Sequence, residues 1–241
     1  MELMWNKLNW REFKQLQEDG FANAILPVGT IEAHGVTPLG TDNIIPEGIA
    51  RNIAPAIKAL IAPTVSYGIT RSLISYSGSL TVSSRAFQDY VVEILLSMAG
   101  QGIKKVIVLN GHGGQMEELR QAAFLTFQKT GIKVAVVHWW IMCESLVEKH
   151  FGTAGGHAAV DETAALMATA PGTIKKDLYD PAMLYHVRPG VNLYPSPSTI
   201  LIYKENTGEL NFDPKRANDY FQAVCEMVRG FALDLFRRWD Q

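Results

Sequence analysis

The feature that most constrains the fold is a strand, a glycine-rich turn and a helix in immediate succession. Residues 106–109 form a short apolar run, residues 110–114 read NGHGG, and apolar residues at helical spacing follow from about 115 to 129. A buried strand that ends in glycines and leads directly into a helix is the βα unit of a parallel sheet. Parallel strands need crossover connections, so this unit implies a sheet covered by helices.

The same alternation extends along the whole chain of 241 residues. Apolar runs predict strands at 24–29, 60–67, 106–109, 133–140 and 199–203. Helical spacing predicts helices at 10–19, 46–57, 85–99, 115–129 and 161–170, and a long one after Asp213. The second of these is expected to start just after Asp42. Residues 141–155 are predicted to be irregular. This order predicts a three-layer α/β/α fold with a mainly parallel central sheet, and the length fits one domain spanning 1–241.

Composition argues against several classes of function. Hydrophobic residues make up 47% of the chain and charged residues 19%, as in ordinary globular proteins. The formal net charge of −2, without large basic clusters, argues against nucleic-acid binding. Cys143 and Cys225 lack CxxC spacing, so buried free thiols are expected. The start shows no signal peptide and no apolar run reaches about 18 residues, so we expect a cytoplasmic protein that binds no membrane.

Three side chains that can bind a metal lie close together after the first apolar strand. Residues 29–35 read GTIEAHG, so Glu32 and His34 leave the end of this strand together, and Asp42 follows. If the backbone stays extended, Glu32 and His34 point to the same side with Cα atoms roughly 6 to 7 Å apart. Simpler explanations exist, because short E-x-H matches are common by chance and Asp42 could be only a helix cap.

Two further histidines precede predicted helices. His112 lies between glycines, which allow the backbone to approach a ligand closely. His157 lies among small residues ahead of Glu162, which stands at a helix start and could merely complement the helix dipole. Because sites in parallel sheets form beyond the carboxyl ends of strands, we expect Glu32, His34 and His112 at one edge. The remaining histidines are predicted to be structural or surface residues: His138, His150 and His186.

Taken together, these segments resemble the creatininase (creatinine amidohydrolase) family of metal-dependent hydrolases. Four segments resemble its signature blocks in the same order and at similar separations: LPVGTIEAHG at 26–35, PLGTD at 38–42, NGHGG at 110–114, and His157 to Glu162. The resemblance covers most of residues 3 to 170. It implies a homo-oligomer, a hexamer by family resemblance, that acts on a small-molecule substrate.

The resemblance also implies a two-metal centre. Glu32 and His112 would hold one divalent ion, His34 would hold a second, and Asp42 would bridge the two. Each ion would lower the pKa of bound water and polarise a substrate carbonyl. His157 would carry a proton to the leaving nitrogen, because imidazole titrates near neutral pH. Oxygen and nitrogen ligands without a thiolate suit Zn, Mn or Fe.

Departures from the family pattern bear on the substrate. Creatininase has a Glu two residues after the metal-binding His, where this chain has Gly114, and Glu162 is the natural replacement. Thr153 stands where creatininase has a Trp that covers the substrate. We therefore expect hydrolysis of a C–N bond in a small amide, cyclic amide or formamide other than creatinine. The alternatives are a peptide-bond or C–C (cyclic keto-sugar) hydrolase on the same scaffold, and a catalytically idle metal- or ligand-binding protein.

Overall fold

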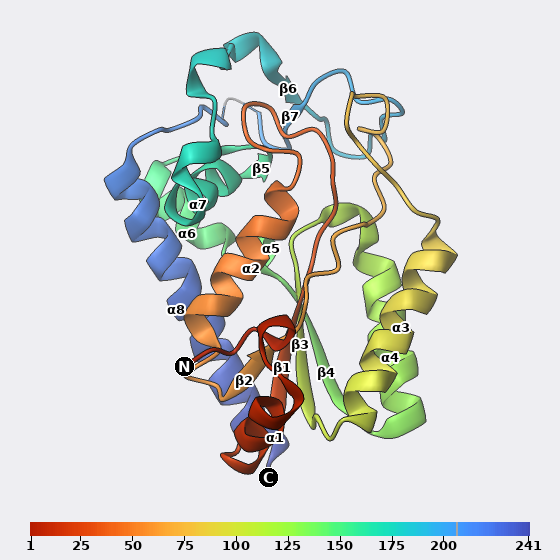
Figure 1. Cartoon of the computed structure of the whole chain (residues 1–241). Helices are drawn as coiled ribbons and strands as arrows, with labels where there is room; N and C mark the ends of the chain where they lie inside the picture. Colours follow the sequence, from red (N-terminus) through yellow and green to blue (C-terminus); the bar gives the residue numbers. More distant parts are fainter. Residues whose placement is uncertain (206) are drawn as a thin grey trace.

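A four-stranded parallel sheet is the framework of the fold (Figure 1). The structure, a computed structural model, describes residues 1–205 and 207–241. Every residue of β3 (Lys105–Asn110) is buried, as are five of the six residues of β1 (Asn23–Val28). Burial on both faces explains why these strands are largely apolar throughout. The strand order is β2 (Ala59–Ile61), β1 (Asn23–Val28), β3 (Lys105–Asn110) and β4 (Lys133–His138).

Helices cover both faces of this sheet (Figure 1). On one side lie α2 (Thr41–Ile53), α6 (Glu144–Phe151), α7 (Val160–Thr169) and α8 (Pro214–Trp239). On the other side lie α3 (Ser84–Gly100) and α4 (Met116–Thr130). α2 packs against β1 and β3, α8 packs against α2, α6 and α7, and α3 packs along α4. The predicted three-layer α/β/α fold with a mainly parallel central sheet is confirmed.

Local sequence signals set the starts of the first and last long helices. α1 (Trp10–Glu18) begins with a capping box, in which the Asn9 side chain accepts backbone N–H groups and Glu12 accepts the N–H of Asn9. α8 begins after Asp213, whose carboxylate accepts backbone N–H groups, with Pro214 at the first helical position. Short 3₁₀ helices lie at Trp5–Lys7, Gly113–Gln115, Pro171–Thr173, Lys176–Leu178 and Pro181–Met183.

The helix expected to start just after Asp42 begins at Thr41, with Pro46 at an interior position. Two stretches differ from the prediction. The strand expected at 60–67 is limited to β2, which ends at Ile61. Residues 141–155, expected to be irregular, contain the second half of α5 (Trp139–Met142) and the whole of α6. These helices have four and eight residues, too few to show a helical period in the sequence.

A small second sheet lies at the carboxyl end of the first sheet (Figure 1). It consists of β5 (Gly156–His157), β7 (Ile200–Ile202) and β6 (Leu184–His186), in that order. β5 runs antiparallel to β7, and β6 runs parallel to it. The strand predicted at 199–203 corresponds to β7. Because β5 contains His157, this sheet brings a predicted site residue to the edge where β1 and β3 end.

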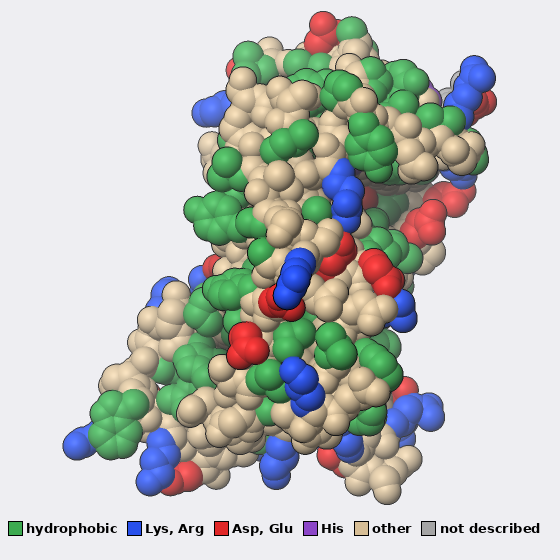
Figure 2. All heavy atoms as spheres, turned by 90° about the vertical axis from the view of Figure 1, so that its right-hand side faces the viewer, with side chains coloured by type: hydrophobic (Ala, Val, Ile, Leu, Met, Phe, Trp, Pro, Cys, Tyr) green, Lys and Arg blue, Asp and Glu red, His purple; other side chains and the backbone are tan. Residues whose placement is uncertain are grey.

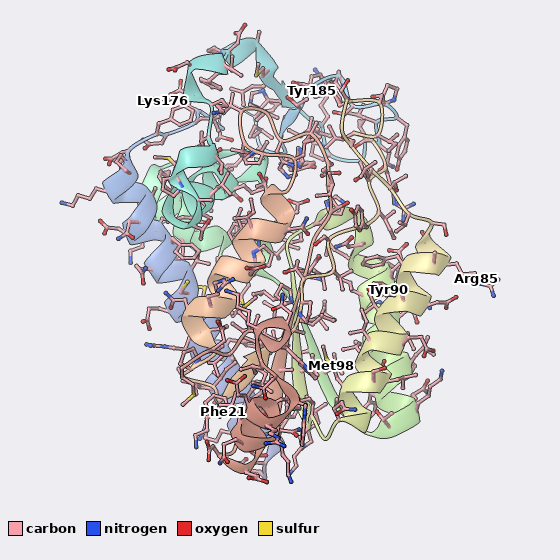
Figure 3. The ribbon with its side chains drawn as sticks, in the orientation of Figure 1. Phe21, Arg85, Tyr90, Met98, Lys176 and Tyr185 are labelled. Atoms are coloured by element: carbon pink, nitrogen blue, oxygen red, sulfur yellow. The ribbon has the colours of Figure 1, made fainter. Side chains whose placement is uncertain are left out.

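Other sequence expectations concern the surface and the thiols. Cys143 and Cys225 are free and buried, as predicted. Within residues 1–205 and 207–241, no helix has the length and apolar character needed to cross a membrane. Figure 2 shows acidic and basic side chains interspersed over one face. In Figure 3, Arg85 extends outward from α3. A surface of mixed charge differs from the basic stripes that bind nucleic acid.

Candidate metal centre

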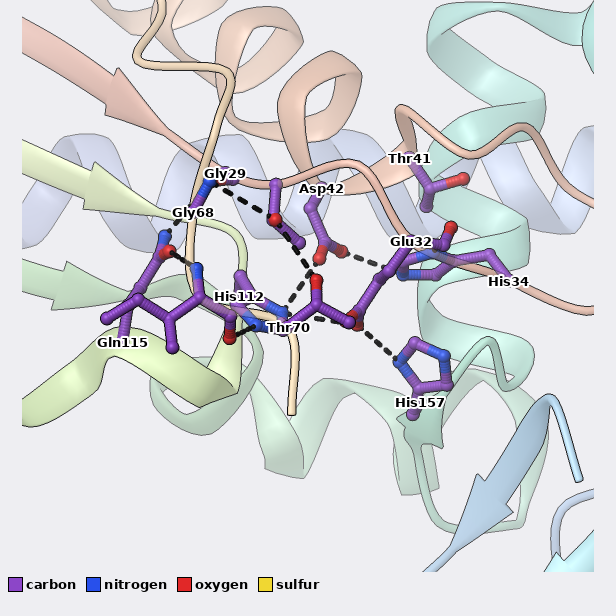
Figure 4. A network of polar contacts seen from close by, with 12 residues as sticks. Gly29, Glu32, His34, Thr41, Asp42, Gly68, Thr70, His112, Gln115 and His157 are labelled. Atoms are coloured by element: carbon purple, nitrogen blue, oxygen red, sulfur yellow. Dashed lines mark hydrogen bonds and ion pairs between the residues drawn. The ribbon is translucent and has the colours of Figure 1, made fainter. Parts of the chain in front are cut away.

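The carboxyl ends of β1 and β3 form the floor of the site. From β1 the chain passes through α2 to β2 on one side, then through α3 to β3 on the other side, so the strand order reverses between β1 and β3. Ligand sites in parallel sheets form at such reversal points. The structure brings Glu32 and His34, which follow β1, together with His112, which follows β3 (Figure 4).

Glycines at the ends of both strands allow Asp42 to approach the sheet. Pro46 has no N–H, so the carbonyl of Asp42 cannot receive the usual helical hydrogen bond from that position. Its oxygen lies against the strand ends instead. A Cβ on Gly29 would stand 2.3 Å from this oxygen, and a Cβ on Gly111 would stand 2.2 Å from it. The two glycines are therefore needed to place Asp42 where it is.

Asp42 lies at the centre of the cluster (Figure 4). It is only 2% exposed, and no side chain caps α2, whose N-cap is Gly40. Its Oδ1 lies 2.9 Å from Nε2 of His34, and its Oδ2 lies 3.0 Å from Nδ1 of His112. The carboxylate is directed at the two imidazoles, so the interpretation of Asp42 as only a helix cap is wrong.

Backbone carbonyls orient both imidazoles. Nδ1 of His34 lies 3.0 Å from the carbonyl oxygen of Glu32, and Nε2 of His112 lies 2.9 Å from that of Ile69. A carbonyl oxygen only accepts, so these nitrogens carry the hydrogen. In the neutral rings, the opposite nitrogens present lone pairs, and these are the nitrogens that face Asp42. Histidine metal ligands are held in this way, by a hydrogen bond from the other ring nitrogen.

The charges of the cluster require protons or cations to balance them. Burial disfavours the imidazolium of His34, but the carboxylates of Asp42 and Glu162 outweigh it and raise its pKa to about 10. Burial opposes ionisation of Asp42, yet His34 and His112 hold its pKa well below the usual range. The pKa of Glu32 is lowered in the same way, against its burial, by His112. Divalent cations can take the place of the ring protons that neutralise these carboxylates.

The donor set fits divalent cations. Two groups of three residues share Asp42, and within each group the ligand atoms lie within 4.8 Å of one another: Glu32, Asp42 and His112, and His34, Asp42 and Glu162. Among the described residues, the buried Oδ2 of Asp42 has no hydrogen-bond donor. It lies 3.0 Å from the lone-pair nitrogen of His112, and two lone pairs at that distance need a proton or a cation between them.

His157 lies beside the cluster (Figure 4). Its ring centroid is 4.2 Å from that of His34, and its Nδ1 is 3.5 Å from Oε1 of Glu32. Its Nε2 donates to the carbonyl of Ala33 at 2.8 Å, so Nδ1 carries the lone pair. Burial and the positive charge of His34 lower the pKa of His157 to about 4. His157 is therefore neutral at pH 7 with its lone pair at Nδ1, and its pKa lies below the near-neutral value expected from the sequence.

Two carboxylates at the start of α7 hold β5 in place. Oε2 of Glu162 accepts the N–H of Ala158 at 2.6 Å and lies 3.7 Å from Nε2 of His34. Oδ1 of Asp161 accepts the N–H of Gly156 at 3.1 Å. Burial raises the pKa of Asp161 to about 6 and that of Glu162 well above its usual range. Sequence reasoning gave a role to Glu162 but none to Asp161, although Asp161 lies within the segment from His157 to Glu162.

Position 114 has no room for a ligand side chain. A Cβ on Gly114 would stand 2.3 Å from the carbonyl oxygen of Ile69 and 2.5 Å from Nε2 of His112. The carbonyl of Gly114 also accepts a hydrogen bond of 3.4 Å from Nε of Arg71. The backbone around Gly114 is therefore packed for a glycine, while Glu162 lies within reach of His34 from the opposite side.

The structure places the three remaining histidines elsewhere. His138 ends β4, and its Nδ1 accepts a hydrogen bond of 2.9 Å from the amide of Asn110. His186 lies on β6, and its Nε2 donates to the carbonyl of Thr207 at 2.9 Å. His150 lies on α6. None of the three occurs in the groups of metal-competent residues found in the described part of the chain.

A cavity of about 580 Å³ opens over the cluster. Glu32, Asp42, His112, His157 and Glu162 all line it. Its other walls come from segments far apart in the sequence, and no motif or period marks them, so sequence reasoning missed them. The most prominent are Arg71, Trp140, Ile141, Val191, Tyr194 and Tyr203.

Known proteins resemble most of this chain. The family described as Creatininase, Creatinine amidohydrolase, matches residues 6–209. Creatinine amidohydrolase from Pseudomonas putida is 24% identical over 195 residues, which cover 71% of this chain and 73% of that protein. The mycofactocin precursor peptide peptidase from Mycolicibacterium smegmatis is 28% identical over 226 residues, which cover 90% of this chain and 85% of that protein.

Solved creatininase structures share the fold. A mutant creatininase described as Zn-Zn type and a creatininase described as Mn each superpose with a TM-score of 0.76 at 20% identity. Each match covers 99% of this chain and 98% of the other. The likeness therefore extends over the whole α/β/α architecture, including the small second sheet.

Proposed function

The chain belongs to the creatininase family of hydrolases, and on that premise we propose that it cleaves a C–N bond of an amide, cyclic amide or formamide with the help of two divalent ions. The observation that carries the proposal is the pair of three-residue groups that share Asp42 on the floor of the cavity. A carboxylate shared by two donor groups is suited to bridge two ions, as in two-metal hydrolases.

The proposed ligands divide into two sets. Glu32 and His112 would hold the first ion, His34 and Glu162 would hold the second, and Asp42 would supply a carboxylate oxygen to each. Bound divalent ions supply a water that is nucleophilic at neutral pH and polarise the substrate carbonyl. The donor set suits Zn, Mn or Fe, and the zinc and manganese creatininase structures support the first two.

His157 is proposed to move the proton. Its lone pair at Nδ1 lies on the cavity side of Glu32, at 3.5 Å from Oε1, where it can accept a proton from the attacking water. The same ring then donates this proton to the leaving nitrogen. The hydrogen bond from Nε2 to Ala33 keeps the ring in one orientation during both steps.

The substrate is proposed to differ from creatinine. Gly114 leaves no space for the creatininase Glu, and the hydroxyl of Thr153 accepts the N–H of Gly208 at 2.7 Å, which ties that residue to a neighbouring loop. Hydrolysis of a peptide bond is the second candidate. It is supported by the precursor peptide peptidase, which is similar over 90% of this chain.

Metal analysis of protein purified without chelator tests the two-ion centre. We expect about two ions per chain, and about one fewer in His34→Ala and in Glu162→Ala. His186→Ala, a histidine outside the cluster, is the matched control and should keep the full content. One ion or none in the unchanged protein would favour an idle metal- or ligand-binding protein. Unchanged stoichiometry in Glu162→Ala would remove this residue from the ligands.

A substrate panel tests the bond that is cleaved. Formamides, cyclic amides, creatinine, small peptides and cyclic keto-sugars are assayed in parallel with Zn or Mn added. Preferential hydrolysis of a non-peptide amide supports the proposal. A preference for peptides would select the second candidate, and activity on keto-sugars alone would overturn C–N cleavage.

A further inference from the structure

One wall of the cavity is apolar and open to solvent. Four large hydrophobic side chains on it are exposed: Ile141 by 51%, Val191 by 46%, Tyr194 by 69% and Tyr203 by 59%. Single exposed hydrophobic residues are common on proteins, but several that line one cavity mark a surface for binding. We refer to these four residues as the apolar wall.

Strand pairing directs the inner end of the apolar wall toward the metal centre. In the antiparallel pair of β5 and β7, His157 stands opposite Leu201, so both side chains lie on the same face. Tyr203 follows two residues later and also lines the cavity. Ile200 and Ile202 alternate with them and fill a separate apolar cluster. The small sheet thus presents one face to the cavity and the other to its own core.

Tyr203 connects the apolar wall with the ligand carboxylates. Tyr203, Glu32 and Glu162 all line the cavity, so this ring and the two carboxylates border the same space. Burial and the negative charges of Glu162 and Glu32 raise the pKa of Tyr203. A group that extends from the reacting end along this lining can contact the ring.

The loop between β6 and β7, which carries Val191 and Tyr194, is held at its far end. The N–H of Ser196 donates to the carbonyl of Ser72 at 2.7 Å, and the carbonyl of Ser196 accepts the hydroxyl of Tyr76 at 3.2 Å. Ser196 itself is buried. Hydrogen bonds therefore fix this end of the loop close to Tyr194, and small-molecule sites are usually largely preformed.

The cavity is also larger than an amide group needs. Its volume of about 580 Å³ falls within the range of sites that enclose drug-sized ligands. We propose that the substrate carries an apolar or aromatic arm next to the amide, and that the apolar wall binds this arm. This inference rests on the proposed function for the amide end of the substrate, and it adds the chemical class of the rest of the substrate.

A pair of hydroxamates tests the proposal. Acetohydroxamate and phenylacetohydroxamate carry the same metal-binding group and differ in a phenyl arm, and calorimetry gives their dissociation constants on zinc-loaded protein. Burial of the arm should make the phenyl probe about tenfold tighter. The ratio of the two constants should fall toward one in Tyr203→Ala. Tyr185→Ala is the matched control, because Tyr185 lies on β6 of the same sheet but outside the cavity lining (Figure 3).

Several outcomes would overturn the proposal. They are equal affinity of the two probes, and a ratio that stays near ten in both Tyr203→Ala and Val191→Ala. Failure of both probes to bind would overturn the zinc site of the proposed function, and with it this inference. The second variant, with the melting temperature of each protein, separates loss of the arm site from loss of folding. Tighter binding of the phenyl probe without hydrolysis of any amide would support the site for the arm. The same result would overturn the proposed C–N hydrolase activity.

Discussion

The two sides of the cavity are built by different means. On the ligand side, His34 and Asp42 are 1% and 2% exposed, and the backbone closes around them. On the apolar wall, Tyr194 and Tyr203 are 69% and 59% exposed. Substitution on the ligand side must disturb buried backbone, whereas substitution on the apolar wall changes what the cavity accepts. One metal centre can therefore serve different substrates if the opposite wall varies.

Replacing Asp42 should cause the largest loss of metal and of activity among these substitutions. In Asp42→Ala both three-residue groups lose their shared oxygen ligand, so we expect the metal content to fall from about two ions to near zero. The hydrolysis rate should fall by at least about a thousandfold. Elemental analysis and initial rates measure the two effects. Loss of only one ion would contradict a bridging role for Asp42.

His157→Ala should separate proton transfer from metal binding. The variant keeps all five proposed metal ligands, so its metal content should stay unchanged. The value of kcat should fall by about a hundred- to ten-thousandfold, the usual contribution of a general acid–base. Rates equal to those of the unchanged protein would exclude His157 from proton transfer. Loss of metal would instead place it among the ligands.

The ligand side of the cavity could be predicted from the sequence in part. Glu32, His34 and His112 could be placed at one edge because each follows an apolar strand, and strand ends of a parallel sheet meet. The start of α2 could also be placed close to Asp42, because a helical pattern follows this residue. The close approach of the Asp42 carbonyl to Gly29 and Gly111 could not be predicted, because no local pattern relates these separate parts of the chain.

The apolar wall could not be predicted from the sequence, for a different reason. β5 has two residues and pairs with β7 across more than forty residues of chain. Neither a hydrophobic periodicity nor a turn motif in the sequence therefore predicts the small sheet. Tyr203 is an ordinary exposed tyrosine until the fold places it in the same cavity lining as His157. Asp161 likewise gains its role only through the N–H of Gly156. Non-local pairing of short segments has no counterpart in local sequence pattern.

Gly111→Ala tests whether backbone packing fixes the ligand side. The new Cβ would stand 2.2 Å from the carbonyl oxygen of Asp42 and 2.6 Å from Cγ of Pro46, so α2 must shift. We expect a loss of about 1 to 3 kcal/mol in unfolding free energy, as for other overpacked sites, and weaker metal binding. Urea denaturation measures the first and metal titration the second.

Gly230→Ala is the matched control for this substitution. It lies within α8, and a Cβ there meets nothing within 4 Å. Alanine has the higher helix propensity, so this variant should be about 0.5 to 1 kcal/mol more stable than the unchanged protein. Equal effects of the two substitutions would mean that close approach of Asp42 to the strand ends contributes nothing.

Val191→Ala should have the smallest effect, and it tests the apolar wall. Val191 is 46% exposed, so truncation leaves no buried cavity, and the unfolding free energy should change by less than about 0.5 kcal/mol. Metal content should not change. For a substrate with an apolar arm, KM should rise about two- to fivefold, because each buried methylene contributes about 0.8 kcal/mol. A destabilisation as large as that of Gly111→Ala would show that the apolar wall is part of the folding core, and the distinction between the two sides would fail.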